Sequence, residues 1–318
     1  IRPRLRSRGL GDVYKRQVVA FTPDWRQLRK MEVLENGFSV LSRPVGPDNT
    51  VCQYRTTREV LLQPLYLAEA RLQTEPDGRA AIRLRFECPD KVDWSKAGID
   101  KVAIYLDADS PVAPALHLAL TRRVQAMYVR HSETRTERVR FDGWYKPMGF
   151  DDTDRLWPKG DSAFSGYQLL LEYFSFREKF MFVELRGLEL AGLSQKTTWF
   201  ETDIVLDGGW PSDMPFETDN FRLHCAPVIN LFSLEADPLT PDPLQNEYLL
   251  RPMRVQDGHT EIYSVDSIHG AVKNGKHPYV PFTSFRHRGG MMRHDAPERY
   301  FHTRVKRGPS GLYDTWLI

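Results

Sequence analysis

Histidine, aspartate and arginine side chains gather near the C-terminal end of the chain. The residues whose types could bind a metal ion are His277, His287, His294, Asp295 and His302. A metal site needs three or four such ligands converging at about 2.0–2.2 Å. The histidine spacings of seven and eight residues give no ready pair on adjacent turns of one helical face, and four arginines interleave with the group. We therefore predict that no metal ion binds here.

The same His/Asp/Arg cluster could serve a hydrolase or a carbohydrate-active enzyme, which is the alternative interpretation of this chain. Ser284 and His287 could act as nucleophile and base, but no orienting acid follows at a recognisable spacing. Asp266 could be a catalytic carboxylate, although an aspartate before a glycine turn more often bonds backbone groups. A pocket that gathers His287, His294 and either Asp266 or Asp295 would support the enzyme.

The recognised catalytic and nucleotide-binding motifs do not occur in the chain. We find no G-x-S-x-G, H-E-x-x-H, G-x-x-x-x-G-K-[ST] or G-x-G-x-x-G pattern. Four arginines lie between residues 130 and 140, but Glu133 and Glu137 interleave with them. This favours a solvated, charge-paired hairpin over a phosphate site. The sequence therefore predicts no catalysis and no cofactor.

Composition sets the class of protein. The chain has 318 residues, of which 41% are hydrophobic, enough for one large or two ordinary cores. Its longest apolar runs, such as 18–21, fall far short of the ~20 residues that a spanning helix needs. The three cysteines, Cys52, Cys88 and Cys225, show no C-x-x-C spacing, which favours buried thiols in a reducing cytosol. We expect no direct insertion into a membrane.

The first 17 residues are expected to lie outside the fold. Residues 12–17 back-translate as GAT-GTG-TAT-AAG-AGA-CAG, which resembles the transposase end sequence used to prepare sequencing libraries. We interpret residues 1–17 as a non-native, adapter-derived tail. They hold six Lys or Arg and one Asp, so without them the net charge changes from +2 to −3. A nucleic-acid partner then loses its main electrostatic support.

Residues 18–141 are predicted to form a β-rich α+β domain. Apolar residues alternate with arginines over 80–86, the period of a half-buried strand. Residues 101–106 and 125–130 predict further strands. Residues 111–124 predict a helix, with Leu116, Leu118 and Leu120 inside and two arginines near its C-terminal end, where cations suit the helix dipole.

Residues 142–160 contain two prolines and show no periodicity, so we expect a linker or a long surface loop. A helix then begins at Asp161 or Ser162. Its apolar stripe, at offsets of three, seven and ten residues, comprises Phe164, Tyr167, Leu171 and Phe174. We expect this stripe to be core. A second β-rich α+β domain, truncated at its C-terminal end, is predicted over 161–318.

The stretch from Asp219 to Ile268 organises this second domain. Alternation predicts a strand from Phe221 to Cys225, which Pro227 ends by removing a backbone donor. The apolar residues after it have helical spacing, and strands over 247–255 and 261–268 would pair as a hairpin. We expect a structural staple between the strand and the hairpin, in which Asn230 bonds backbone groups. Its members are Phe221, Cys225, Val228, Ile229, Asn230, Leu231 and Phe232.

Several segments also form a collinear series along the chain. They read YRTTREVLLQPLYLAEAR (54–71), GFDDTDRLWP (149–158), FSGYQLLLEYFSFREKFMFVELRGL (164–188), DNFRLHCAPVINLF (219–232), EADPL (235–239), NEYLLRP (246–252) and EIYSVDSIHG (261–270). This series resembles the TssF (VasA/ImpG) family, a baseplate subunit of the bacterial type VI secretion system. Collinear matches across about 300 residues are more specific than any single short motif.

The resemblance implies a structural wedge subunit of this contractile injection system, with parts of the family missing at both ends. It implies TssG as a heteromeric partner, contacts with TssK and TssE, and two TssF copies in each wedge. It implies a cytoplasmic location, with the baseplate docked at the inner-membrane complex. We expect interface residues at Trp210, Phe216 and Trp316. A generic β-rich binding module without a role in secretion is the third interpretation.

Overall fold

The computed structural model of the chain divides into two compact units. Unit 1 comprises residues 1–16, 39–55 and 229–318, and unit 2 comprises residues 17–38 and 56–228. The residues that the structure describes are 2–9, 16–25, 27–44, 49–88, 99–134, 137–157, 164–194, 197–253, 260–272, 275–282, 299–308 and 313–318. Both units are rich in strands, which confirms the predicted β-rich α+β class.

The boundary between the units differs from the one predicted at residues 142–160. Strand β12 (Trp144–Pro147) lies inside that segment and pairs with β13 (Phe182–Arg186), and a short 3-10 helix, η1 (Asp152–Asp154), follows. The segment is therefore part of unit 2. Lack of periodicity marked it as irregular, but irregular chain still joins a sheet wherever its backbone groups find partners.

Unit 2 contains both described α-helices and most of the longer strands. Its helices are α2 (Val112–Arg122) and α3 (Ser165–Ser175), with the 3-10 helices η2 (Arg177–Phe180), η3 (Leu188–Leu190) and η4 (Thr218–Asn220). Its further strands are β2 (Arg16–Ala20), β3 (Glu32–Leu34), β6 (Val60–Leu62), β7 (Tyr66–Thr74), β8 (Ala80–Glu87), β9 (Lys101–Leu106), β10 (Val124–His131), β11 (Val139–Arg140), β14 (Trp199–Leu206), β15 (Phe221–Leu223) and β16 (Cys225–Ile229).

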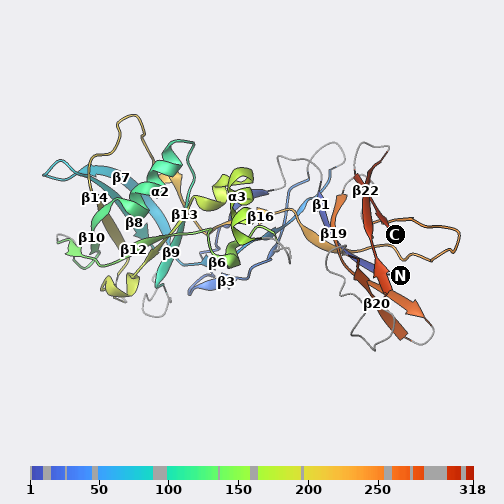
Figure 1. Ribbon diagram of the computed structural model, residues 1–318. Coiled ribbons are helices and arrows are strands. Elements are labelled where there is room, and N and C mark those ends of the chain that lie inside the picture. Colours follow the sequence, from blue (N-terminus) through green and yellow to red (C-terminus); the bar gives the residue numbers. More distant parts are fainter. Residues whose placement is uncertain are drawn as a thin grey trace, which may run out of the picture. The chain divides into compact units, whose positions relative to one another are not determined.

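Two antiparallel sheets build the core of unit 2, in the orders β11-β10-β14-β8-β7 and β12-β13-β9-β15. The predicted alternation is confirmed in β8, where Ile82, Leu84 and Phe86 are fully buried. Phe86 stacks on Phe200 of β14, with ring centroids 4.8 Å apart. Helix α2 lies against the same sheets (Figure 1), and its Leu116 and Leu120 join their core. The helix predicted over 111–124 is thus confirmed, but Leu118, which we expected inside, is 52% exposed because residues two apart point to different sides of a helix.

Unit 1 is held by a small core of its own. Its strands are β1 (Arg2–Gly9), β4 (Ser39–Leu41), β5 (Gln53–Thr56), β17 (Phe232–Glu235), β18 (Tyr248–Leu249), β19 (Thr260–Val272), β20 (Gly275–Pro281), β21 (Arg299–Phe301), β22 (Thr303–Arg307) and β23 (Tyr313–Leu317). They include a sheet ordered β17-β1-β19-β20-β21 and another ordered β18-β23-β22. Leu250, Ile268, Phe301 and Leu317 are buried together between them.

The N-terminal segment differs from the expectation of a tail without packed contacts. Strand β1 pairs antiparallel with both β17 and β19, with Leu5 opposite Leu234 and Val265. A backbone with unpaired donors and acceptors can complete a sheet whatever its sequence origin. Val13 and Tyr14 lie outside the described residues, and the adapter origin of residues 1–17 stays a prediction.

The organising stretch is extended where helical spacing was predicted. Val228 and Ile229 continue β16, and Phe232 begins β17, so the prediction of helical spacing is wrong. Pro227 lies within β16 instead of ending a strand. Its carbonyl still accepts hydrogen bonds from the backbone N–H (3.1 Å) and the hydroxyl (3.2 Å) of Thr57. Proline removes a donor and leaves the acceptor intact, which reconciles it with this position.

Among the described residues, the two strands of the hairpin predicted between residues 247 and 268 do not pair with each other. Strand β18 pairs with β23, with Tyr248 opposite Leu317, whereas β19 pairs with β1 and β20. Alternation identifies a strand without naming its partner, because the pairing edge is chosen by tertiary packing. In the described part of the chain, no helix combines the length and apolar character needed to span a bilayer.

Candidate functional site

The C-terminal histidine group lies mostly outside the described residues. Only His277 and His302 are described, and both are exposed. Asp266 was predicted at a strand end before a turn, which is wrong. It is an exposed residue inside β19, and its Oδ1 accepts a hydrogen bond from the Ser264 hydroxyl at 3.1 Å. The long run of paired backbone explains the difference, because β19 continues through Gly270 without turning.

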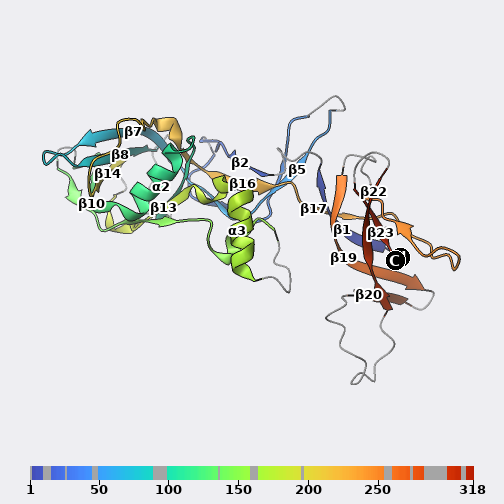
Figure 2. The ribbon, with the colours of Figure 1, turned by 45° about the horizontal axis from the view of Figure 1, so that its top comes forward.

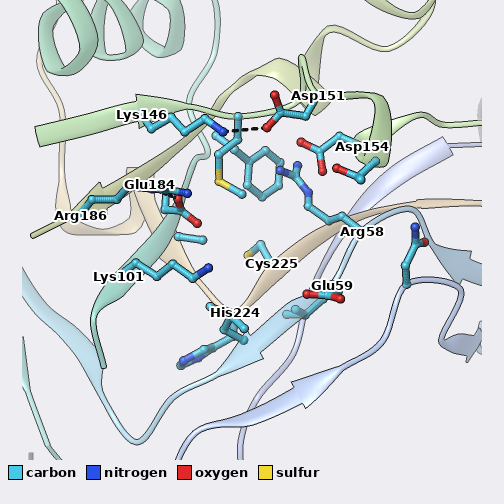
Figure 3. A pocket seen from close by; sticks show the side chains of 17 residues that line it. Arg58, Glu59, Lys101, Lys146, Asp151, Asp154, Glu184, Arg186, His224 and Cys225 are labelled. Carbon is cyan, nitrogen blue, oxygen red and sulfur yellow. Dashed lines mark hydrogen bonds and ion pairs between the residues drawn. The ribbon is translucent and has the colours of Figure 1, made fainter. Parts of the chain in front are cut away.

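A pocket of about 330 Å³ lies within unit 2 (Figure 3), and it contains none of the predicted catalytic histidines or aspartates. Four basic side chains line it, namely Arg58, Lys101, Lys146 and Arg186, together with the acidic Glu59, Asp151, Asp154 and Glu184. Several of these charges pair with one another. Lys146 Nζ lies 2.7 Å from Asp151 Oδ2, and Arg186 bonds Glu184. The balance of charge selects for neither an anionic nor a cationic ligand.

Arg58 forms the most constrained part of this pocket. Its guanidinium lies over the Phe182 ring, with Cζ 4.0 Å from the ring centroid. Nη2 donates to the carbonyl of Lys179 at 3.5 Å, while Nε and Nη1 have no hydrogen-bond partner among the described residues. Burial lowers the pKa of Arg58 to about 10, opposed by the nearby Asp154 carboxylate. A guanidinium stays charged at neutral pH under these conditions, and it packs here as a structural side chain.

His224 and Cys225 also line the pocket, but they do not form a nucleophile and base. Burial raises the pKa of the Cys225 thiol to about 12, so the thiolate is disfavoured. Burial lowers the pKa of His224 to about 4, and its Nε2 accepts a hydrogen bond from the backbone N–H of Gln63 at 3.2 Å. The sequence prediction of Cys225 as a buried thiol agrees with this. His224 has a left-handed φ of 54°, which separates β15 from β16.

Helix α3 buries its polar face, the opposite of the expected arrangement. Glu172 and Lys179 form an ion pair in which each side chain is only 1% exposed. Glu172 Oε1 also accepts from the backbone N–H of Leu156 (3.2 Å) and from Gln168 Nε2 (3.0 Å). Gln168 in turn donates to the Trp157 carbonyl at 2.8 Å. Burial lowers the pKa of Lys179, with Glu172 opposing the shift.

The apolar face of α3 is exposed, so the expectation that its stripe is core is wrong. The exposed fractions are 70% for Phe164, 74% for Tyr167, 59% for Leu171 and 81% for Phe174. Figure 2 shows α3 along its length. The hydrogen-bonded network of Glu172 and Gln168 explains the inversion, because buried polar groups need partners that only this orientation provides. Sequence periodicity found this face, and only the structure shows that it is uncovered.

The predicted interface aromatics Trp210 and Phe216 are half-buried against the core of unit 2. Their rings contact edge-to-face with centroids 5.5 Å apart, and Trp210 Nε1 donates to the Met214 carbonyl at 2.6 Å. Trp316 lies in β23, the middle strand of its sheet, with the Lys306 ammonium 4.8 Å from its ring centroid. Their role as interface residues stays a prediction.

The residues of the predicted staple are mostly buried. Val228 is 0%, Leu231 2%, Asn230 4% and Ile229 7% exposed. Phe221 and Cys225 are buried as well. Phe232 is half-buried, so it is a smaller contributor than the buried aromatic that we expected. Whether these residues act as a staple stays a prediction.

Comparison with known proteins shows which family the chain matches. The family model described as "Type VI secretion system, TssF" matches residues 16–314. The type VI secretion system component TssF1 of Pseudomonas aeruginosa is 30% identical over 300 residues, covering 88% of this chain and 47% of the relative.

Two solved structures are similar to the chain. One is the TssK-TssF-TssG baseplate subcomplex of a type VI secretion system, with a TM-score of 0.88 and 55% identity over 99% of this chain. The other is a type VI secretion system baseplate complex, with a TM-score of 0.60 and 50% identity over 99% of this chain. The chain spans 58% and 52% of those two chains and about half of the curated relative. This chain belongs to the TssF family of the type VI secretion system.

Proposed function

We propose that this chain forms part of a structural subunit of the bacterial type VI secretion baseplate and acts through protein–protein contacts. The observation that carries the proposal is the TM-score of 0.88, at 55% identity, with a chain of the TssK-TssF-TssG subcomplex. Likeness at that identity over 99% of this chain supports the same role in the assembly as well as the same fold.

The chemistry of the pocket supports a role without catalysis. Its cysteine is held as a thiol, its histidine is neutral, and two of its carboxylates, Asp151 and Glu184, pair with Lys146 and Arg186. An active site instead gathers a nucleophile with a base whose pKa suits proton transfer. The hydrolase alternative used residues of the C-terminal cluster, and nothing in the described pocket favours it.

The partners that we propose for the chain are TssG and TssK, the two subunits named with TssF in the similar subcomplex. Contact with TssE and a second TssF copy in each wedge are proposed from the family resemblance. We also infer a cytoplasmic location, with the baseplate docked at the inner-membrane complex. No nucleic acid or membrane insertion is part of the proposal.

Co-expression tests this function directly. The chain would carry an affinity tag and be produced together with TssG and TssK from the same bacterium. We expect both partners to co-purify with the chain at fixed stoichiometry through size-exclusion chromatography. A folded chain that elutes alone, while TssG and TssK are present and soluble, would overturn the proposal.

A further inference from the structure

Helix α3 adds no side chain to the hydrophobic core of the two sheets. Among its described side chains only Gln168 and Glu172 are buried, and both are polar. Helix α2 has the same length of 11 residues, yet it buries four apolar side chains, those of Ala113, Leu116, Ala119 and Leu120. Tertiary packing of an apolar face is what supplies most of the stability of a helix in a protein. Helix α3 is therefore held in another way.

The apolar contacts of α3 are partial and lie near its C-terminal end. Tyr173, which is 40% exposed, contacts the buried Phe180 with ring centroids 5.6 Å apart. Phe176, the first residue after the helix, is buried. Four further large apolar side chains of α3 are between 56% and 81% exposed, namely Tyr167, Leu170, Leu171 and Phe174. The chain is thus fixed to the unit just after α3 and not along the helix.

Helix α3 also has little local support. Phe164 occupies the N-cap position and makes no side-chain capping hydrogen bond. Gly166 lies in the first turn, and neither an acidic residue in that turn nor a basic residue in the last turn complements the helix dipole. Isolated helices shorter than about 12–15 residues are marginal in water. We therefore expect α3 to lose its helical structure when it leaves its seat.

A polar anchor beneath α3 holds the helix in place. Glu172 pairs with Lys179, and its Oε1 accepts a hydrogen bond from the backbone N–H of Leu156 at 3.2 Å. Gln168 donates to the Trp157 carbonyl at 2.8 Å. Water would satisfy each of these groups if the helix lifted away, so the net contribution of the anchor is smaller than the strength of its separate bonds.

We propose that α3 is a detachable element, which leaves its seat as one cooperative unit while the two sheets of unit 2 stay folded. Parts of a protein open separately where few buried apolar contacts connect them to the rest. The core of the sheets and of α2 does not depend on α3, because no side chain of α3 joins it. The unit thus has two states, seated and detached, that differ in α3 alone. This inference goes beyond the proposed function and needs no partner.

The ion pair between Glu172 and Lys179 sets the balance between the two states. Lys179→Met leaves a buried carboxylate without its partner in the seated state, whereas water solvates that carboxylate in the detached state. This variant should therefore shift the balance toward the detached state by roughly 100-fold. Glu172→Gln combined with Lys179→Met removes both charges, and it should bring the balance back to within about tenfold of the wild type.

Hydrogen exchange of the full chain at a series of low urea concentrations, read by mass spectrometry, tests the proposal without any variant. We expect the amides of α3 to exchange faster than those of α2. Their exchange should also depend much less on urea, because detachment exposes less surface than unfolding of the whole unit. Lys179→Met should accelerate exchange at α3 roughly 100-fold, and the double variant should restore it to within about tenfold of the wild type. Lys146→Met, which alters an exposed pair, is the matched control and should leave it unchanged.

Two results would overturn the detachable helix. One is exchange of the α3 and α2 amides at the same rate and with the same dependence on urea, since α3 would then open only together with the whole unit. The other is fast exchange at α3 that Lys179→Met does not alter, since the polar anchor would then not control the seat. Failure of TssG and TssK to co-purify with the chain would instead bear on the proposed function alone.

Discussion

The buried ion pair beneath α3 gives the sharpest stability prediction. Lys179→Met removes the ammonium and leaves the Glu172 carboxylate, which is 1% exposed, without its counter-charge. Breaking a buried pair in this way costs about 3–5 kcal/mol. The carboxylate keeps hydrogen bonds from Leu156 N–H and Gln168 Nε2. These neutral donors place the expected loss at the lower end, about 3 kcal/mol.

Urea unfolding followed by tryptophan fluorescence would measure the loss. In the matched double variant, Glu172→Gln with Lys179→Met, neither charge of the pair is left and the Gln carbonyl can still accept from the Leu156 N–H. We expect this variant to recover most of the lost stability, since replacing both charges of a buried pair is often near neutral. An exposed pair provides the control. Lys146→Met, opposite Asp151, should cost at most about 1 kcal/mol because solvent screens that pair.

The reasoning fails if Lys179→Met changes the unfolding free energy by less than about 1 kcal/mol, the range of a solvent-screened pair. It also fails if the double variant is no more stable than the single one. Either result would mean that water or local rearrangement solvates the Glu172 carboxylate. The α3 face would then lack the fixed orientation that the buried ion pair is expected to give it.

Three further predictions concern other parts of the chain. His224 has a pKa of about 4 in the folded chain, so between pH 6.5 and about 4 the unfolded chain binds a proton that the folded chain does not. The free energy of unfolding should therefore fall by up to about 3 kcal/mol as the pH drops through that window. The variant His224→Gln should show a smaller dependence of this free energy on pH. Phe200→Ala, which removes a fully buried ring stacked on Phe86, should cost about 3–5 kcal/mol in urea unfolding, whereas Phe164→Ala, at 70% exposure, should change it by less than about 0.5 kcal/mol. Re-sequencing of the source locus should give different codons for residues 1–17, because residues 12–17 back-translate as a transposase end sequence, and identical codons would show that the segment is native.

The arginines between residues 130 and 140 show how far charge patterns can be read. A charge-paired hairpin was predicted, and β10 and β11 do pair, with Tyr128 opposite Arg140. The partners are different from the interleaved glutamates, however. Arg138 makes a two-pronged contact with Glu75 at 2.7 and 2.8 Å, and Arg130 lies 3.3 Å from Glu201. The sequence indicated that these charges would be neutralised, and the sheet determined which carboxylates do so.

The sequence by itself determined the family, the β-rich class and the elements with strong local patterns. The strand at 101–106 and the helix within 111–124 are where their patterns place them, because alternation and helical periodicity follow from backbone geometry. The sequence also shows directly that the recognised catalytic motifs do not occur in the chain. These features depend on residues that are close in the chain.

Only the tertiary structure decided which strands pair, where the units divide and which face of α3 is covered. Strand β18 pairs with β23 and not with β19, the next strand in the sequence. The polar side chains of Gln168 and Glu172 are buried. An apolar stripe shows that a helix has a face to bury, but it does not say what buries it. The inward direction here was set by Lys179, Leu156 and Trp157, whose contacts with α3 exist only once the chain has folded.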